Sequence, residues 1–285
     1  PFWCREWLLA MSLRAVGLLG VFAWILYQSD EKVQLFTLRK TRSEMEEAEA
    51  LMSKAPRSVQ SCESAADIFR RSITSGASAK LHLDLADALN CVMRIKTNAN
   101  MLLISGTQDT PENIRIWKEV GLEAWEHARL ALESMPHNPR AASVYADAFQ
   151  YMSSAQGILR QALTGGGQEF LRNARRMQQV GPQEEGGLGF MFEGCFFIAA
   201  PWPLRDLSKA LQLMKKAYAL KKSKRNFYYM GLAHYHLEHW NEAMLFFTQA
   251  RDASPEFLSE YDFAQGLTKE ASHGVELCKT HLAAT

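Results

Sequence analysis

The stretch "GLAHYHLEHWNEAMLFFTQARDASP", residues 231–255, carries two patterns that predict different functions. Three histidines, His234, His236 and His239, lie within six residues, and clustered histidines are typical of metal sites. The small and aromatic residues of the same stretch recur at spacings of three and four, as they do where one helix packs closely on another. The histidine pattern would indicate a metal site and hence an enzyme. The spacing pattern would indicate packed helices without catalytic chemistry.

The second pattern resembles a tetratricopeptide repeat (TPR), a helix–turn–helix unit of about 34 residues. Small residues in this repeat let its two helices approach closely, an aromatic residue fills the space between them, and a proline follows the second helix. His234 departs from the pattern, because the family has a tyrosine at that position. The matching positions are Phe227, Met230, Gly231, Ala243, Phe247, Ala250 and Pro255.

Parts of the same repeat recur upstream in the chain. One copy keeps the pattern of the second helix, and a later copy keeps positions of both helices, with an insertion between them. The matching residues are Ala124, Ala128, Ala131 and Pro136 in the first copy, and Phe190, Gly194, Phe197, Ala210, Met214 and Ala217 in the second. The remaining segments follow only the general helical spacing.

Apolar residues recur at helical spacing throughout the body of the chain, and no stretch alternates as a half-buried strand would. Breaks rich in Gly, Pro, Ser or Asn separate the helical segments. We therefore predict an all-α fold, a TPR-like α-solenoid of stacked helical hairpins over residues 57–285. The predicted helices cover residues 59–75, 78–104, 111–134, 139–163, 167–180, 187–199, 204–221, 225–237, 240–253 and 257–280.

The positions of the histidines in the repeat argue against a metal site. His234 and His236 are two residues apart and point to nearly opposite sides of a helix. His236 and His239 have a spacing that suits a metal, but the repeat places the turn between its helices near residues 237–240. We therefore expect surface or groove histidines, and we predict no metal, no cofactor and no catalytic residue.

An apolar run near the amino terminus, Trp7 to Tyr27, contains one charged residue, Arg14. Its length suits a hydrocarbon core of about 30 Å, and aromatic residues lie near both of its ends. We predict a transmembrane helix within residues 1–29, with residues 7–27 in the lipid bilayer. A secretory signal and a buried helix of a soluble protein are the alternatives. Because an arginine is costly in lipid, Arg14 is expected to snorkel or to pair with a carboxylate of a neighbouring subunit.

Residues 30–56 are highly charged, end on Pro56, and are predicted to form a helical stalk. More Lys and Arg residues follow the predicted span than precede it, which favours a body on the cytosolic, matrix or stromal side. The sequence starts with Pro1 rather than with methionine. A removed targeting peptide would explain that start, so an organelle membrane, that of the mitochondrion, is the expected location.

The composition excludes several classes of protein. A net charge of +1, from 32 basic and 31 acidic residues, gives no field that would attract nucleic acid, so no nucleic-acid partner is expected. The five cysteines lie far apart, without a C-x-x-C pair and in an odd number, which predicts small buried side chains rather than a zinc ribbon or a complete disulfide framework and leaves the redox compartment open.

The stretch "FFIAAPWPLRD", residues 196–206, is the most distinctive apolar segment of the body. It is expected either to fill the core between hairpins or to line a groove for a partner helix or an acyl chain. The candidate partner-binding residues are Arg14 in the predicted span and Phe196, Phe197, Trp202 and Leu204 in this segment.

Two further motifs suggest chemistry only weakly. The glycines of residues 164–170 could present N–H groups to an anion, but they lack the preceding strand and the following Lys-Ser/Thr of a P-loop. Glu184 and Glu185 are adjacent carboxylates, and adjacent side chains diverge, so joint acid–base work is not expected. We predict a helix–helix link and a solvated loop at these two places.

At a larger scale the order of the helical segments is similar to that of the regulator-of-microtubule-dynamics family and to the T component of tripartite periplasmic transporters. The first resemblance implies a membrane-anchored helical solenoid that binds proteins or lipid. We predict a non-enzymatic, membrane-anchored TPR scaffold, an accessory or structural subunit that binds other protein subunits of a larger membrane assembly. A membrane tether or a lipid-binding TPR protein is the alternative.

Overall fold

The structure is a computed structural model that describes residues 42–98, 102–104, 108–156 and 165–284. The chain divides into two compact units, Pro1–Glu47 and Ala48–Thr285. The predicted transmembrane helix, including Arg14, lies outside the described residues, and so does the first part of the stalk. None of the described helices has the length and apolar character that a membrane crossing requires.

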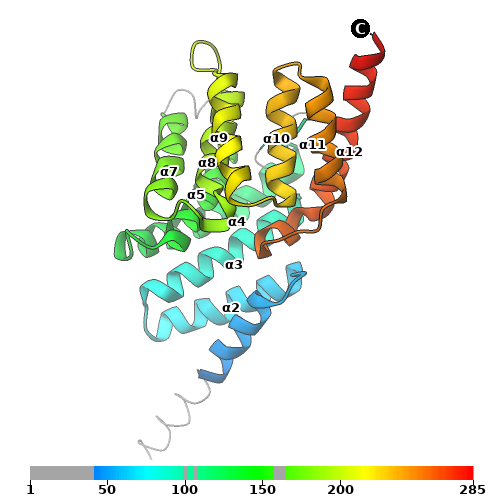
Figure 1. The fold of residues 1–285 in the computed structure, drawn as a ribbon. Helices are drawn as coiled ribbons and strands as arrows, with labels where there is room; N and C mark the ends of the chain where they lie inside the picture. The colour runs from blue at the N-terminus through cyan, green and yellow to red at the C-terminus, as the bar shows by residue number, and fades with distance from the viewer. Residues whose placement is uncertain (1–41, 99–101, 105–107, 157–164, 285) are drawn as a thin grey trace, which may run out of the picture. The chain divides into compact units, whose positions relative to one another are not determined.

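The described residues form helices and connecting turns, without a strand (Figure 1). A helix over residues 42–53 precedes the labelled ones, and a short 3-10 helix, η1 (Glu184–Gly186), precedes α8. The α-helices are α2 (Val59–Ser75), α3 (Ala79–Thr97), α4 (Pro111–Ser134), α5 (Pro139–Ser154), α7 (Gly166–Val180), α8 (Leu188–Ala199), α9 (Leu207–Leu220), α10 (Lys224–His236), α11 (Trp240–Asp252) and α12 (Leu258–Ala284). Helices that follow one another in the chain pack together, so the predicted all-α stack of hairpins is confirmed.

Two predicted helices were too long. The helix predicted over residues 78–104 ends at Thr97, because Asn98 adopts the left-handed conformation (φ 50°) and donates its N–H to the Arg94 carbonyl as a cap. The helix predicted over residues 139–163 ends at Ser154, and residues 157–164 lie outside the described part of the chain. Apolar residues beyond a helix end keep the helical spacing by chance, so the cap decides the boundary.

The clearest repeat of the sequence, α10 with α11, shows why its small residues are needed. Phe247 on α11 is fully buried, and its ring lies against Gly231 of α10 and Gly274 of α12. A Cβ atom placed at either glycine would stand 2.7 Å from that ring. The two glycines therefore let three helices close around one aromatic ring.

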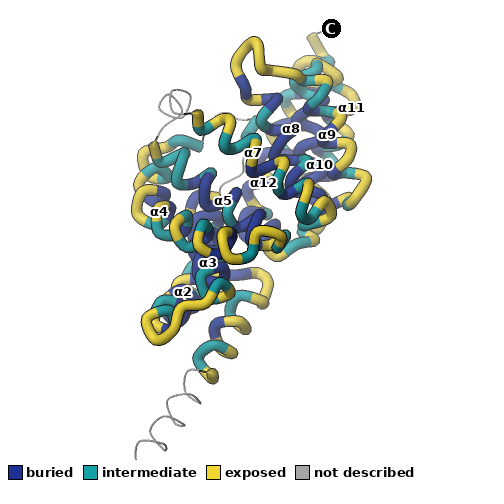
Figure 2. The backbone as a smooth tube through the Cα atoms, turned by 90° about the vertical axis from the view of Figure 1, so that its left-hand side faces the viewer, coloured by how far each residue is buried: buried dark blue, intermediate teal, exposed yellow. Residues whose placement is uncertain are grey.

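The last helix, α12, contacts helices that are not its neighbours in the chain. Besides its chain neighbour α11, α12 packs against α10 and against α3. Its first residues are buried to an unusual degree for a polar segment, and the helix bends at Phe263, where the backbone is not helical (φ −128°, ψ 18°). In Figure 2 the tube is coloured as buried in α3 and in parts of α12. The start of α12 thus joins the last helices of the stack to α3.

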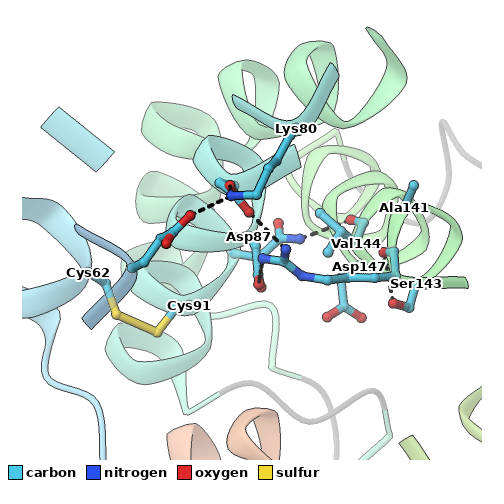
Figure 3. Close-up of polar contacts among 12 residues, drawn as sticks. Cys62, Lys80, Asp87, Cys91, Ala141, Ser143, Val144 and Asp147 are labelled. Atoms are coloured by element: carbon cyan, nitrogen blue, oxygen red, sulfur yellow. Dashed lines mark hydrogen bonds and ion pairs between the residues drawn. A yellow bond between two sulfur atoms is a disulfide. The ribbon is translucent and has the colours of Figure 1, made fainter. Parts of the chain in front are cut away.

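One prediction about the cysteines was wrong. Cys62 on α2 and Cys91 on α3 are both fully buried and form a disulfide across the first hairpin, with 6.4 Å between their Cα atoms (Figure 3). Met52 of the preceding helix packs against this pair. Cys195 and Cys278 are free and buried, as predicted. The 29 residues that separate the bonded pair match no short cysteine motif, so no local pattern indicated the bond.

Replacing Gly231 tests the packing of the repeat. A methyl group in Gly231→Ala would meet the ring of Phe247, which Gly274 blocks from the other side, so we expect a loss of about 1–3 kcal/mol in the free energy of unfolding. Urea unfolding measures it. The control is Gly76→Ala, where a Cβ atom would meet nothing within 4 Å and the φ of 167° is extended, and we expect a change below about 1 kcal/mol. Equal effects at the two glycines would contradict the packing described here.

Candidate functional site

A carboxylate buried at the centre of the body joins its beginning to its end. Asp262 of α12 accepts two hydrogen bonds from Arg57, from Nε at 3.0 Å and from Nη2 at 2.6 Å, and a third from Nε of Arg94 at 2.8 Å. The Asp262 side chain is fully buried, and the two guanidinium groups are 3% and 5% exposed. Charged groups at this depth are stable only when they are paired, so each member of this triad requires the others.

The triad is part of a larger network around α3. Arg94 also donates to Asp147 of α5 at 2.8 Å. Arg140 of α5 donates to Asp87, which Figure 3 labels, at 2.7 Å. Burial opposes the ionisation of Asp87, but the charges of Arg140, Arg94 and Arg57 outweigh it and hold its pKa below the usual value. We call the set of Arg57, Asp87, Arg94, Arg140, Asp147 and Asp262 the central ion cluster.

Asp147 differs from the other carboxylates of the central ion cluster. Burial raises its pKa to about 6, and the nearby charge of Arg94 only partly offsets this effect. A carboxyl group with such a pKa is a feature of many active sites. Here its one ion-pair partner is Arg94, whose guanidinium also serves Asp262, so the arrangement resembles a structural ion network more than a catalytic pair.

A second set of polar contacts, besides the triad, holds the start of α12. Arg225 of α10 donates from Nη1 to the Glu185 carboxylate at 3.0 Å, and its Nη2 donates to the Glu185 carbonyl. Ser259 of α12 donates to the same carboxylate at 2.6 Å. Glu185 has a left-handed backbone (φ 43°, ψ 42°), which is costly for a residue with a side chain and is maintained by these bonds. The loop predicted to be solvated is thus fixed to α10 and α12.

The pocket between the triad and the contacts of Glu185 is small, and charged residues form part of its wall. The pocket there has a volume of about 30 Å³, room for about one water molecule, and its walls include Arg94, Asp147, Glu185 and Arg225. In a helical solenoid the concave interior is a common binding surface. In this chain Ser259 and Phe263, near the start of α12, form part of the pocket wall.

The loop between α8 and α9 is the most exposed apolar feature among the described residues. Trp202 is 89% exposed and Leu204 is 58% exposed. The loop projects beyond the helix ends, as Figure 1 and the exposed colouring of Figure 2 show. A pocket of about 800 Å³ lies along it, between Phe197 at the end of α8 and Lys209 at the start of α9. The ammonium group of Lys209 stands 4.1 Å from the centroid of the Phe197 ring.

The structure separates the candidate residues of this segment into two groups. Phe197, Trp202 and Leu204 line the same pocket, although Phe197 is only 8% exposed. Phe196 lies outside it and stacks on Phe170 of α7, with 6.5 Å between the ring centroids. The segment therefore both fills the core and presents a surface. The fifth candidate, Arg14, is outside the described residues.

His234 and His236 lie in the last turn of α10, and His239 is the N-cap of α11. Residues 237–239 form the turn predicted between the two helices of the repeat. The Nδ1 atoms of His234 and His239 are 3.3 Å apart, and the His234 ring stacks on Phe246. Burial, and then the neighbouring His239, lower the pKa of His234. Within the described part of the chain, no group of three or more His, Cys, Asp or Glu residues could hold a metal ion. The pairing of His234 with His239 was not predicted.

Sequence reasoning missed the central ion cluster. Arg57 and Asp262 are 205 residues apart, and Arg94 and Asp262 are 168 apart. The only local signal was that a charged segment near residue 260 follows the proline that ends the clearest repeat, at a place where a further helix was expected.

The fold is similar to that of a solved TPR protein. The crystal structure of TTC0263, a thermophilic TPR protein of Thermus thermophilus, matches 83% of this chain and 99% of its own with a TM-score of 0.56 and 14% identity. The chain has a TPR fold.

Two further TPR structures match with low TM-scores. Yeast Tom70 gives a TM-score of 0.30 at 14% identity, over 80% of this chain and 63% of that chain. The TPR2AB domain of yeast Sti1, in its complex with pHSP90, gives 0.28 at 12% identity, over 82% of this chain and 99% of that chain. No protein-family model matches the chain, and no curated protein matches it. The specific family resemblance in the sequence therefore stays a prediction.

Removing the central carboxylate tests the closure of the stack. Asp262→Ala would leave Arg57 and Arg94 buried without their shared partner, and we expect a loss of about 3–5 kcal/mol in the free energy of unfolding. The matched control is Asp67→Ala, which removes a carboxylate 62% exposed beside Arg70, and its expected cost is below about 1 kcal/mol. An Asp262 variant as stable as the control would show that the central ion cluster does not hold α12.

The raised pKa of Asp147 predicts a pH dependence. Because the folded state favours its neutral form, its contribution to stability is fully present below about pH 4 and is lost as the pH rises through about 6. Asp147→Asn keeps a neutral group, so relative to the unsubstituted chain it should gain up to about 3 kcal/mol between pH 4 and pH 8. Urea unfolding across this range measures the difference, in which the histidine contributions cancel. A pH-independent difference would contradict the assignment.

Proposed function

We propose that this protein is a non-enzymatic interaction protein, an accessory subunit that docks on a larger membrane assembly. The observation that carries the proposal is the combination of a closed helical stack with an exposed apolar loop, the loop between α8 and α9. A TPR fold supplies surfaces for association rather than a reaction centre, and the perturbed carboxyl of the described interior, Asp147, is held in an ion network. Trp202 and Leu204 are the residues through which the body contacts its target.

The membrane part of the proposal rests on the sequence. Residues 7–27 have the length and composition of a single transmembrane helix, and Arg14 within them would pair with a carboxylate of another subunit. An organelle membrane such as that of the mitochondrion is the proposed location.

The lipid-binding alternative draws less support from the body. A solenoid that carries lipid inside needs a continuous apolar cavity. The pocket beside the start of α12 has a volume of about 30 Å³, and four of its wall residues, Arg94, Asp147, Glu185 and Arg225, are charged. This pocket is too small for an acyl chain.

Two features of the chain point to opposite sides of the membrane. The excess of Lys and Arg after the predicted span favours the cytosolic, matrix or stromal side. The disulfide between Cys62 and Cys91 is typical of an oxidising compartment. Denaturation of native membranes in the presence of a thiol-alkylating reagent, followed by mass spectrometry, decides the matter, because both cysteines are buried in the native fold. Blocked Cys62 and Cys91 place the body on the oxidising side, and alkylated ones place it where the charges predict.

Crosslinking mass spectrometry on native membranes tests the proposed function. We expect the full chain to stay in the membrane pellet after carbonate extraction and to crosslink reproducibly to the subunits of one assembly. Trp202→Ser should reduce these crosslinks and leave the chain in the pellet, because it changes the docking loop and not the anchor. Release of the chain by carbonate, or a full chain that behaves as a monomer without crosslinks, would contradict the proposal.

A further inference from the structure

Helix α9 and the segment that follows it carry positive charge without a balancing acid. Residues 207–237 contain seven Lys and Arg residues and no Asp or Glu, although the whole chain has a net charge of only +1. Elsewhere on the body, exposed bases commonly pair with an acid one turn away on the same helix, as Arg115 does with Glu119 at 2.7 Å and Lys279 with Glu276 at 2.8 Å. Because α9 contains no acid, its bases cannot be neutralised in this way.

Three of the seven bases are satisfied within the body. Lys224 donates to three carbonyl groups at the end of α11, and Arg225 binds the Glu185 carboxylate. Lys221 pairs with a carboxylate at 3.0 Å. The other four have no carboxylate of the described residues within 4.0 Å. We call these four the lysine set: Lys209, which is half-buried, and Lys215, Lys216 and Lys222, which are exposed.

Aromatic rings hold three members of the lysine set in place. The ammonium groups of Lys209 and Lys216 stand 4.1 and 5.6 Å from the ring centroids of two phenylalanines of α8. That of Lys222 stands 5.6 Å from the centroid of the Tyr218 ring. A ring that attracts a cation also restricts its side chain, so these charges have defined positions and lose less entropy when a partner binds.

The spread of the charges sets the size of the anion that could bind them. Lys209 and Lys216 are two helical turns apart on α9, about 10.5 Å along its axis, and Lys222 lies beyond the end of the helix. A single phosphate or carboxylate group is too small to contact both ends of this surface. The lysine set therefore requires a partner with several negative charges.

We infer that the lysine set binds an acidic segment of another protein subunit, in which several Asp or Glu carboxylates lie against the four ammonium groups. The inference rests on the proposed function, because it names the chemistry of one partner within the membrane assembly. It concerns the surface of α9, and not the loop that carries Trp202. Complementary charges of this kind steer association and fix the register of two proteins.

A protein segment suits the lysine set better than a lipid bilayer does. Helices that bind a membrane surface insert apolar side chains into the lipid, and the large apolar side chain exposed on α9 is Leu220, at its end. The rest of the exposed surface of α9 is small, polar or basic. Lipids diffuse and can neutralise cations in any arrangement, whereas the carboxylates of a folded protein have fixed positions and complement cations that are held in place.

Carbodiimide crosslinking in native membranes tests the inference, because this reagent joins a lysine amine directly to a carboxylate that contacts it. Full chains with Lys215→Glu/Lys222→Glu and with Lys215→Arg/Lys222→Arg are compared with the unsubstituted chain. Both variants lack the same two reactive amines, so the crosslink of Lys216 reports the effect of charge alone. Mass spectrometry identifies the carboxylates that Lys216 reaches.

We expect Lys216 of the unsubstituted chain to crosslink to Asp or Glu residues that cluster in one segment of one other subunit. The Arg variant should keep this yield. The Glu variant should lose it about tenfold, since an exposed ion pair contributes up to a few-fold and repulsion replaces it at two positions. Lys118→Glu/Lys269→Glu, the same charge change at exposed positions on α4 and α12, should leave the yield unchanged.

Equal yields in the Glu and Arg variants would overturn the inference. Crosslinks to the assembly through other residues of the chain, without one from Lys216, would also overturn it and would leave the proposed function standing. A chain without crosslinks to any subunit would contradict both. Acetylation of lysine amines adds a test against lipid. If protein-free vesicles of phosphatidylcholine and phosphatidylglycerol protect Lys215 and Lys216 as strongly as native membranes do, the target is a lipid surface and the inference is wrong.

Discussion

The carboxylate of Asp262, held between Arg57 and Arg94, is the interaction on which the closed form of this structure depends. A stack of helical hairpins contacts only its sequence neighbours and is open at both ends. Here α12 packs against α3, and its buried Asp262 accepts hydrogen bonds from Arg57 and Arg94, which lie near the beginning of the body. A buried charge without a partner would cost several kcal/mol, so the pairing specifies where α12 lies as well as stabilising it there.

The closure determines which surfaces are free to bind. The pocket beside the start of α12 has a volume of about 30 Å³, room for about one water molecule. The disulfide of the first hairpin lies near the triad in the chain, since Cys62 is five residues after Arg57 and Cys91 is three residues before Arg94. It fixes α3, which carries Arg94, to α2, which Arg57 directly precedes. What is left for association is the outer surface, where the loop with Trp202 stands out.

The repeat could be predicted because its pattern lies in neighbouring residues. The contact of α12 with α3 could not, because the residues that form it are far apart in the chain. The spacing of Gly231, Ala243 and Phe247 predicted the α10–α11 hairpin and its turn, because close helix packing requires small and aromatic residues at fixed spacings. Asp262 looks in sequence like any polar residue at the start of a helix, and its partners are 168 and 205 residues away. The apolar segment near residue 200 was predicted, but a proline-rich loop has no period that shows which of its side chains face outward.

Hydrogen exchange of the native body measures the central claim most directly. If Asp262 joins α12 to α3, the amides of α3 and those of α12 around Phe263 will exchange only through one shared opening, with the same free energy and the same response to denaturant. Substitution of Asp262 will lower that energy for both helices together. Exchange of α12 through a separate opening of lower energy, while α3 stays protected, would show that the last helix is an appendage and that the buried ion pairs do not close the stack.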